Sequence, residues 1–281
     1  MRLANRAGRA LLLSRDMTRG VDLESASAGR FGPDPMLALA NWDALRGFGA
    51  ELDLSGAPAA DAASLGPCSP RPRAVFGIGL NYRDHAAEAG LPEPKEPLVF
   101  TKFPSCLVGP HSDVVLFGDR VDWEAELVVV IGRRAENVPE ARALEFVAGF
   151  CAGQDVSDRK LQFASQPPQF SLGKSRATFG PIGPAIVSLD ELANPLDLAI
   201  SCDLDAERMQ TSRTSQLIFG VPELVAYLSR HCELVPGDLI FTGTPGGVGS
   251  ARKRYLKPGE TIRTELEGVG KLVNRCVAPA A

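Results

Sequence analysis

The sequence lacks the features of a membrane-spanning, secreted or zinc-thiolate protein. No apolar stretch reaches the ~18 residues that a membrane span needs, and the apolar run near the N-terminus is too short and too interrupted for a signal peptide. The six cysteines are scattered, with no Cys-x-x-Cys spacing, so each is expected to be a small apolar residue and not a metal ligand or half of a disulfide. We therefore expect a reducing, cytoplasmic setting and no membrane partner.

The chain also lacks a strong charge of either sign. Its net charge of −4 over 281 residues argues against nucleic acid as a partner. The apolar content of 44% and the charged content of 23% are those of an ordinary globular protein. The 28 glycines and 22 prolines are typical of a turn-rich, β-rich fold.

The expected elements divide the chain into a small N-terminal module, residues 1–68, and a larger domain, residues 69–281. The module is expected to contain a hairpin within residues 2–13 and one helix over residues 36–48, followed by a connector rich in Ala, Ser, Gly and Pro. The larger domain has many short strands without a regular alternation of strands and helices, and a helix candidate over residues 139–146. This order predicts a β-rich α+β fold and not a doubly wound sheet.

One predicted strand, residues 122–132, carries two glutamates ahead of five apolar residues and a glycine. Because side chains alternate along a strand, Glu124 and Glu126 point to the same face, roughly 7 Å apart. On an exposed edge strand they would simply form a solvated acidic face. On a buried strand, one of them must be protonated or a cation must lie between them.

Other polar residues lie on or next to apolar elements. Asp155 ends an apolar strand and needs a partner if it is buried. His85 and Glu88 are three residues apart in a short predicted helix, so they emerge on one face; alone, such a pair is usually at the surface. Lys174 follows a glycine but is not part of a phosphate-binding loop, because the earlier glycine of that motif is missing. It is either a surface lysine or a cation directed at a polar site.

Together, Glu124, Glu126 and Asp155 would make an all-oxygen site. Such a donor set suits a hard divalent ion, Mg²⁺ or Mn²⁺, with Ca²⁺ as a further candidate, and does not suit structural Zn²⁺. Three protein ligands leave coordination positions for water and for a substrate with two neighbouring oxygens, such as a 2-keto acid or a 1,3-diketone.

In their order and spacing, these residues resemble the fumarylacetoacetate hydrolase superfamily over residues 73–277. The stretches that carry the resemblance are Gly79-Leu80-Asn81-Tyr82-x-x-His85-x-x-Glu88, Asp122-Trp123-Glu124-x-Glu126-Leu127, Gln154-Asp155-Val156-Ser157, Gly173-Lys174-Ser175, Gly180-Pro181-x-Gly183-Pro184, Gln210-x-Ser212-x-Thr214 and Thr242-Gly243-Thr244-Pro245-x-Gly247-Val248-Gly249. The resemblance implies a mixed β-sandwich roll that forms a homodimer, with one Mg²⁺ or Mn²⁺ in each subunit.

The resemblance also implies roles for particular residues. Glu124, Glu126 and Asp155 would be the metal ligands, and Lys174 would bind and polarise the substrate oxygens. His85 and Glu88 would form a dyad, on a lid over the substrate, that activates water. The other matched positions would contact the substrate: Tyr82, Gln210, Thr242, Gly243 and Thr244.

The activity that the resemblance implies is metal-dependent hydrolysis of a C–C bond in a small β-diketo acid of the acylpyruvate or fumarylacetoacetate type. Two alternatives stay open. The same metal chemistry without water attack would give an oxaloacetate-type decarboxylase, or an isomerase or hydratase of a 2-hydroxydienoate such as 2-hydroxyhepta-2,4-diene-1,7-dioate. A non-catalytic protein of the same fold would be expected to have a broken triad or dyad, whereas both are intact here. The complete dyad favours water activation.

Overall fold

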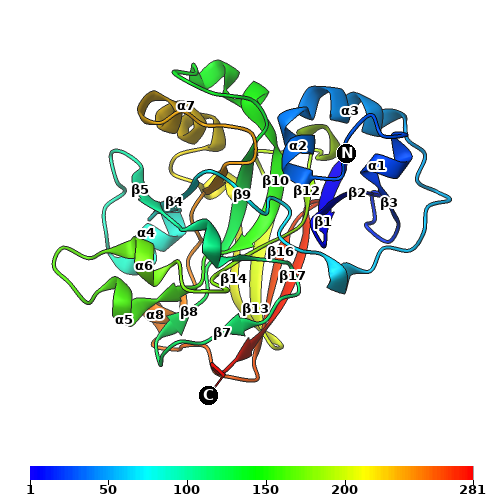
Figure 1. Cartoon of the computed structure of the whole chain (residues 1–281). Helices are drawn as coiled ribbons and strands as arrows, with labels where there is room; N and C mark the ends of the chain where they lie inside the picture. The colour runs from blue at the N-terminus through cyan, green and yellow to red at the C-terminus, as the bar shows by residue number, and fades with distance from the viewer. Residues whose placement is uncertain (281) are drawn as a thin grey trace.

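The computed structural model describes residues 1–280, and its largest element is a ten-stranded sheet (Figure 1). The strand order is β3-β2-β1-β12-β10-β9-β15-β4-β5, and β6 pairs with β12 off this path. The strands are β1 (Arg2–Arg6), β2 (Arg9–Leu13), β3 (Gly20–Asp22), β4 (Val75–Gly79), β5 (Leu98–Thr101), β6 (Leu107–Val108), β9 (Ala125–Ile131), β10 (Val147–Gln154), β12 (Gly180–Val187) and β15 (Leu239–Phe241).

A second sheet of five strands covers one face of the large sheet, in the order β14-β13-β16-β17-β7. Its strands are β7 (Val114–Val115), β13 (Ala199–Leu204), β14 (Glu207–Arg213), β16 (Thr261–Leu266) and β17 (Gly270–Val277). Leu127 and Val129 of β9 share one buried core with Ile200 of β13 and Ile262 of β16. A separate pair of short strands, β8 (Val121–Asp122) and β11 (Ser157–Asp158), leads into and out of the large sheet.

The other face of the large sheet is covered by N-terminal helices, which lie beside β9, β10 and β12 in Figure 1. The α-helices are α1 (Leu23–Ala26), α2 (Pro35–Ala40), α3 (Trp42–Glu51), α4 (Arg83–Ala89), α5 (Arg159–Gln162), α6 (Phe170–Gly173), α7 (Val221–His231) and α8 (Gly249–Arg252), and the 3₁₀ helices are η1 (Ala62–Ser64), η2 (Pro104–Cys106), η3 (Glu140–Phe146), η4 (Leu189–Glu191) and η5 (Thr214–Gln216). Val128 and Val130 of β9 pack with Leu39 and Leu45 of these helices. Because β9 is buried on both faces, its sequence after Glu126 is a continuous apolar run, residues 127–131.

The N-terminal residues extend the large sheet. The predicted hairpin is confirmed, with β1 and β2 paired around Ala7 and Gly8, and β1 in turn pairs antiparallel with β12. The single helix expected over residues 36–48 is wrong: α2 and α3 are separate, because the backbone at Asn41 (φ −112°, ψ 33°) leaves the helical conformation. The boundary at residue 68 stays a prediction.

The β-rich α+β fold class is confirmed, since the two packed sheets dominate the structure and the helices lie at their faces and edges. The helix candidate over residues 139–146 is a 3₁₀ helix, η3, and two strands that were not predicted, β14 and β16, build much of the small sheet. Among the described residues, no helix combines the length and the apolar character needed to cross a membrane.

Candidate active site

Three buried carboxylates meet where β9 begins and β10 ends. The antiparallel pairing sets Glu126 opposite Gly153, so Asp155, just after β10, lies beside Glu124, just before β9. The backbone N–H of Asp155 donates to the carbonyl oxygen of Glu124 at 2.9 Å. One carboxylate oxygen from each of the three residues lies within 4.8 Å of the others, and all three side chains are buried. The expected solvated acidic face is therefore excluded, and the candidate ligand set is assembled.

Lys174 is a buried counter-ion of this triad and not a surface lysine. Its side chain is 3% exposed, and its Nζ donates to Glu124 Oε2 at 2.7 Å, Asp155 Oδ2 at 2.7 Å and Ser157 Oγ at 2.9 Å. All three N–H groups are therefore used within the protein. The predicted contact of Lys174 with substrate oxygens requires that one of these bonds be exchanged for the substrate.

Two further buried cations, Lys102 and Arg159, complete the network and were missed by the sequence analysis. Lys102 Nζ donates to Asp155 Oδ1 at 2.6 Å and to the carbonyl oxygen of Phe179 at 3.1 Å. Arg159 donates from Nη2 to Glu124 Oε1 at 2.6 Å and from Nε to Asp122 Oδ2 at 2.8 Å. One signal was present in the sequence: Lys102 is a charged residue within the largely apolar segment 98–103, and a charge on a buried element needs a partner.

The three carboxylates of the triad are not equally neutralised. Burial opposes ionisation of Glu124, but Lys174 and Arg159 outweigh it and lower the pKa of Glu124 to about 2. Burial, followed by the charges of Asp155 and Glu124, raises the pKa of Glu126 well above its ordinary value. Glu126 Oε2 accepts one hydrogen bond, from the backbone N–H of Gly243 at 2.7 Å, and no lysine or arginine of the described chain contacts it.

The donor set therefore fits a divalent cation. A cation placed between the three carboxylates would stabilise the charged form of Glu126, which burial and its neighbours otherwise oppose. Only oxygen ligands are present, as Mg²⁺ and Mn²⁺ prefer. The residues present thus suit the metal that the sequence predicts, and the role of each as a ligand stays a prediction.

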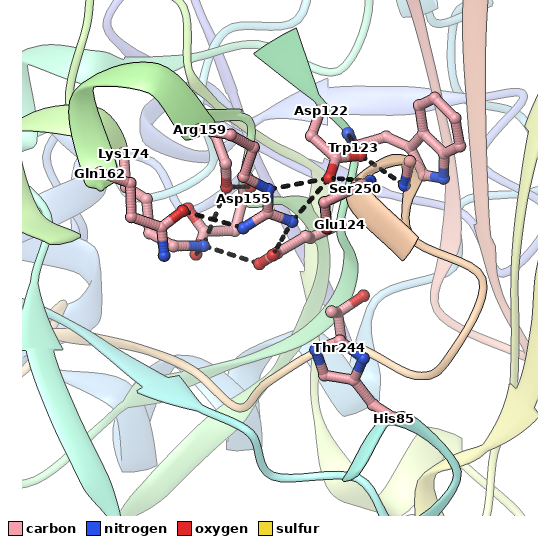
Figure 2. A network of polar contacts seen from close by, with 12 residues as sticks. His85, Asp122, Trp123, Glu124, Asp155, Arg159, Gln162, Lys174, Thr244 and Ser250 are labelled. Carbon is pink, nitrogen blue, oxygen red and sulfur yellow. Dashed lines mark hydrogen bonds and ion pairs between the residues drawn. The ribbon is translucent and has the colours of Figure 1, made fainter. Parts of the chain in front are cut away.

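A cavity of about 300 Å³ opens next to this network, with Glu124, Arg159 and Lys174 in its wall. Figure 2 shows the network on one side of this space, with His85 and Thr244 facing it from the other. The outer wall is apolar and includes Leu80, Leu91, Leu98, Phe100, Phe163 and Phe170. The ring of Phe170 packs edge-on against Phe100 and Phe163, with centroids 5.7 and 6.3 Å apart.

His85 and Glu88 lie on α4 as the predicted pair. Their closest atoms, His85 Nδ1 and Glu88 Oε2, are 3.7 Å apart, which is an ion-pair distance but too long for a hydrogen bond. His85 Nδ1 is buried and has no other hydrogen-bond partner among the described residues. Glu88 Oε2 also accepts from the backbone N–H of Gly247 at 2.9 Å. The contact has the looseness common for catalytic pairs without substrate.

The glycine loop after β15 binds anions, and the anions are carboxylates of the protein itself. Its N–H groups donate to Glu126 from Gly243, to Glu88 from Gly247, and to Asp122 from Gly249 at 2.7 Å. The loop therefore connects Glu126 of the triad, Glu88 and Asp122 of the Arg159 network through backbone hydrogen bonds.

Of the residues predicted to contact substrate, Thr244 lines the cavity. Gln210 is buried, and all its polar groups bond within the protein: Oε1 accepts from Ala125 N at 3.0 Å, and Nε2 donates to Thr244 Oγ1 at 2.9 Å and to Pro245 O at 2.8 Å. Gln210 thus positions Thr244. Tyr82, Thr242 and Gly243 are buried and are not among the residues that line the cavity, and their contact with substrate stays a prediction.

The fold and this site define a protein with a buried carboxylate triad beside a largely apolar cavity, and comparison with known proteins identifies its family. Residues 74–277 match the family model for the C-terminal domain of fumarylacetoacetate (FAA) hydrolase, so the chain belongs to this family. A mitochondrial oxaloacetate tautomerase of Bos taurus is 42% identical over 224 residues, which are 78% of this chain and 71% of the relative.

Two solved structures match the fold of this chain over its full length. An HpcE-like protein of Mycobacterium smegmatis is 49% identical, with a TM-score of 0.93 over 100% of both chains. The maleylpyruvate hydrolase of Sphingobium sp. SYK-6, solved with manganese(II) and pyruvate, is 27% identical, with a TM-score of 0.82 over 100% of both chains. Relatives of this chain thus include enzymes that hydrolyse or tautomerise small keto acids.

Proposed function

We propose that this protein is a divalent-metal-dependent hydrolase that cleaves a C–C bond of a small acylpyruvate-type 2,4-diketo acid. The observation that carries the proposal is the buried carboxylate triad, one member of which, Glu124, lines the same cavity as His85. Glu124, Glu126 and Asp155 would hold Mg²⁺ or Mn²⁺, and the maleylpyruvate hydrolase binds manganese(II) together with pyruvate. When bound, the ion would polarise the substrate oxygens as a Lewis acid.

The residues of the chain would perform the proton transfers. His85 takes a proton from a water molecule, which adds to the carbonyl carbon farther from the substrate carboxylate. Glu88, 3.7 Å from Nδ1, stabilises the charged imidazole. The bond from that carbon to the neighbouring CH₂ group then breaks, and its electron pair stays on the CH₂ as the enolate of pyruvate. Protonation of this carbon gives pyruvate and the carboxylic acid of the acyl group.

The apolar outer wall favours a substrate with an apolar acyl group. The fixed cations among the described lining residues are Arg159 and Lys174, and both are bonded to carboxylates of the network. A second carboxylate at the far end of the substrate would face Leu91, Leu98 and Phe163 without a charged partner. These side chains offer contacts to an apolar acyl group and no ion pair to a carboxylate, so an acylpyruvate suits this cavity better than a diacid.

Oxaloacetate tautomerisation is the second candidate function, favoured by the 42% identity to the bovine tautomerase. The reaction moves a proton between C3 and the C2 oxygen and needs the same base, but no attacking water. The oxaloacetate-type decarboxylase and the 2-hydroxydienoate isomerase or hydratase would also use this cavity. Oxaloacetate is a diacid, and the apolar wall argues for the acylpyruvate.

The test is an ultraviolet assay that follows the enol absorbance of acetylpyruvate and of oxaloacetate with Mg²⁺, with Mn²⁺ and with a chelator. Metal-dependent release of pyruvate from acetylpyruvate, abolished by His85→Gln, is the expected result. Equilibration of oxaloacetate enol without pyruvate release from any acylpyruvate would replace the hydrolase with the tautomerase. Chelator-resistant turnover of either compound would contradict both.

We also propose that the protein is a homodimer. The strand β5 ends the large sheet, and no described strand pairs with its outer edge. Large apolar side chains are exposed on and beside it, including Leu98, Val99 and Phe103, which are 50%, 40% and 49% exposed. Light scattering should give twice the chain mass, and Val99→Lys should give the single-chain mass, whereas a monomeric wild type would contradict the proposal.

We further propose a cytoplasmic location. It is supported by the cysteines, none of which forms a disulfide in the described chain, as suits a reducing compartment. Cell fractionation with a compartment marker would test it, and recovery of the protein in another compartment would contradict it.

A further inference from the structure

A second cavity, of about 840 Å³, lies at the N-terminal edge of the large sheet. Its walls come from β1, the turn that follows β2, α3 and η4, and none of its lining residues lines the catalytic cavity. Four arginines contribute to the wall: Arg2, Arg15, Arg19 and Arg46. No residue predicted from the sequence to have a function is among them.

Arg2 is the buried member of this set. It lies on β1 and is 5% exposed, and its Nε is buried without a hydrogen-bond partner among the described residues. The nearest carboxylate oxygen, Glu191 Oε2, is 3.7 Å from Nε, beyond hydrogen-bond distance. Glu191 is already used, because its Oε1 accepts from the Met1 amine at 2.8 Å. A buried guanidinium without a matched acceptor is costly, which points to an acceptor supplied by a ligand.

The other charges around the cavity do not supply that acceptor. Arg15 and Arg46 are exposed at its wall, and neither forms an ion pair within the part of the chain that the structure describes. Arg19 uses one N–H on the carbonyl oxygen of Ala57 at 2.8 Å. The carboxylate of Asp16 accepts from Ser14 Oγ at 2.6 Å. Burial opposes ionisation of Asp190, the third carboxylate of the wall, but a hydrogen bond from Ser188 and the charges of the Met1 amine and Arg46 outweigh it and lower its pKa. The wall therefore carries four guanidinium groups and the Met1 amine against the three carboxylates of Asp16, Asp190 and Glu191.

We propose that this cavity is a binding site for a small organic oxyanion, with its carboxylate or phosphate groups on Arg2, Arg15 and Arg46. A guanidinium presents its N–H groups as a planar fork that matches the oxygens of either group. The lining side chains Leu13 and Leu54 provide an apolar surface for the rest of the molecule. The volume of about 840 Å³ is within the range of roughly 300–1,000 Å³ that is usual for small-molecule sites.

The experiment is a calorimetric titration of the metal-free full-length protein with citrate and, separately, with inorganic pyrophosphate. We expect saturable binding of one anion per chain for at least one probe, and the probe that binds distinguishes a carboxylate site from a phosphate site. Arg2→Met and Arg46→Ala should each weaken that binding about 10-fold or more. Arg142→Ala, which removes an exposed arginine paired with Glu145, is the matched control and should leave the affinity unchanged.

Glu126→Ala separates this site from the catalytic cavity, because it should leave anion binding intact while it abolishes turnover. The proposal is overturned if neither anion saturates the protein below about 10 mM, or if Arg2→Met and Arg46→Ala bind as tightly as the wild type. Loss of anion binding in Glu126→Ala would also overturn it. If Arg2→Met does not fold, Arg46→Ala decides, since Arg46 lies exposed on α3.

Discussion

The catalytic cluster proposed above (Glu124, Glu126 and Asp155 with their cations) and the N-terminal cavity each bury one ionisable group whose charge the protein itself does not neutralise. In the catalytic cluster this charge is Glu126, next to two other carboxylates. In the N-terminal cavity it is Arg2, whose pKa is lowered because burial outweighs the attraction of Glu191. The two regions differ in sign: the first calls for a cation and the second for an anion.

They also differ in construction. Around Glu126, the cations Lys102, Lys174 and Arg159 are buried and bonded to carboxylates, so the site is held rigid before any ligand arrives. Around Arg2, two of the neighbouring arginines are exposed and unpaired. A rigid site suits catalysis, which needs precise geometry, whereas a looser one suits binding alone. The predictions below test this contrast.

The largest effect is expected from Glu126→Ala in the catalytic cluster. It removes the carboxylate that most needs the cation, and the Lewis acid that the cation supplies is worth several kcal/mol. We expect kcat/KM with Mn²⁺ to fall by more than about 1,000-fold. The control is Glu145→Gln, at an exposed carboxylate, which should keep wild-type activity. If Glu126→Ala kept a kcat/KM within about 10-fold of the wild-type value, Glu126 would not be a metal ligand needed for catalysis.

Arg159→Met should cause the next largest effect, on stability. It leaves Glu124 and Asp122 buried with fewer partners, and breaking a buried pair by removing one partner costs about 3–5 kcal/mol. Urea denaturation measures the free energy of unfolding. The exposed pair of Arg142 and Glu145 provides the contrast, since Arg142→Ala should change the free energy of unfolding by less than about 1 kcal/mol. Equal losses of unfolding free energy in Arg159→Met and Arg142→Ala would contradict the claim that Arg159 neutralises the buried carboxylates of Glu124 and Asp122.

His85→Gln should separate chemistry from metal binding. His85 lines the same cavity as Glu124 but is not a member of the carboxylate triad. Loss of a general base typically lowers the rate by about 100-fold or more. We expect kcat to fall by this amount while Mn²⁺ binding, measured by calorimetry, stays unchanged. A parallel loss of Mn²⁺ affinity would show that His85 holds the metal site and is not the base.

The pH dependence of metal binding should report on Glu126. Its folded pKa is raised well above the ordinary 4.5, so in metal-free protein its contribution to stability is complete below pH 4.5 and is lost as pH rises through the folded pKa. Mn²⁺ must displace the same proton, so its affinity should rise with pH over this window. Glu124, with a pKa of about 2, is ionised throughout.

Thermal unfolding with and without Mn²⁺ at about pH 6 and about pH 8 measures this effect. The stabilisation by Mn²⁺ should be larger at the higher pH, by up to about 1.4 kcal/mol per pH unit. Glu126→Gln cannot ionise and should lose this dependence. A stabilisation that is equal at both values in the wild type would contradict the raised pKa of Glu126.

The smallest effect is expected from Arg2→Met on stability without ligand. The substitution removes a buried guanidinium that has no matched acceptor and keeps an apolar side chain of similar length, so the free energy of unfolding should fall by less than about 1 kcal/mol or should rise. Denaturation in urea without added anions measures it. A loss of unfolding free energy as large as that of Arg159→Met would show that the Arg2 guanidinium has a stabilising partner within the protein.

Local patterns were sufficient to predict much of the fold. The apolar runs predicted β9 and β10, and the pattern of residues 2–13 predicted the first hairpin. The break at Asn41 was not predictable, because the apolar spacing continues through it. Strand β16 was missed because Ile262 and Leu266 are its only apolar residues, and the buried position between them is Thr264.

The site was predictable only where a motif marks it. Glu124, Glu126 and Asp155 follow from the family spacing, but Lys102 is 53 residues from its partner Asp155 and the two meet only through the sheet. Arg2 is 189 positions before Glu191 (191 − 2 = 189), and its lack of a close acceptor is a property of packing. The sequence lists the charged residues. Whether a buried charge has a partner of opposite charge depends on contacts between residues far apart in the chain.

The most direct test of the account is a calorimetric titration of wild type and Glu126→Gln with Mn²⁺. The account predicts one ion per chain in the wild type and an affinity at least about 100-fold lower in the variant, with folding preserved because the amide keeps the shape and the bond from Gly243. Equal affinity in the two proteins, or no binding in either, would contradict the claim that the buried triad is a metal centre.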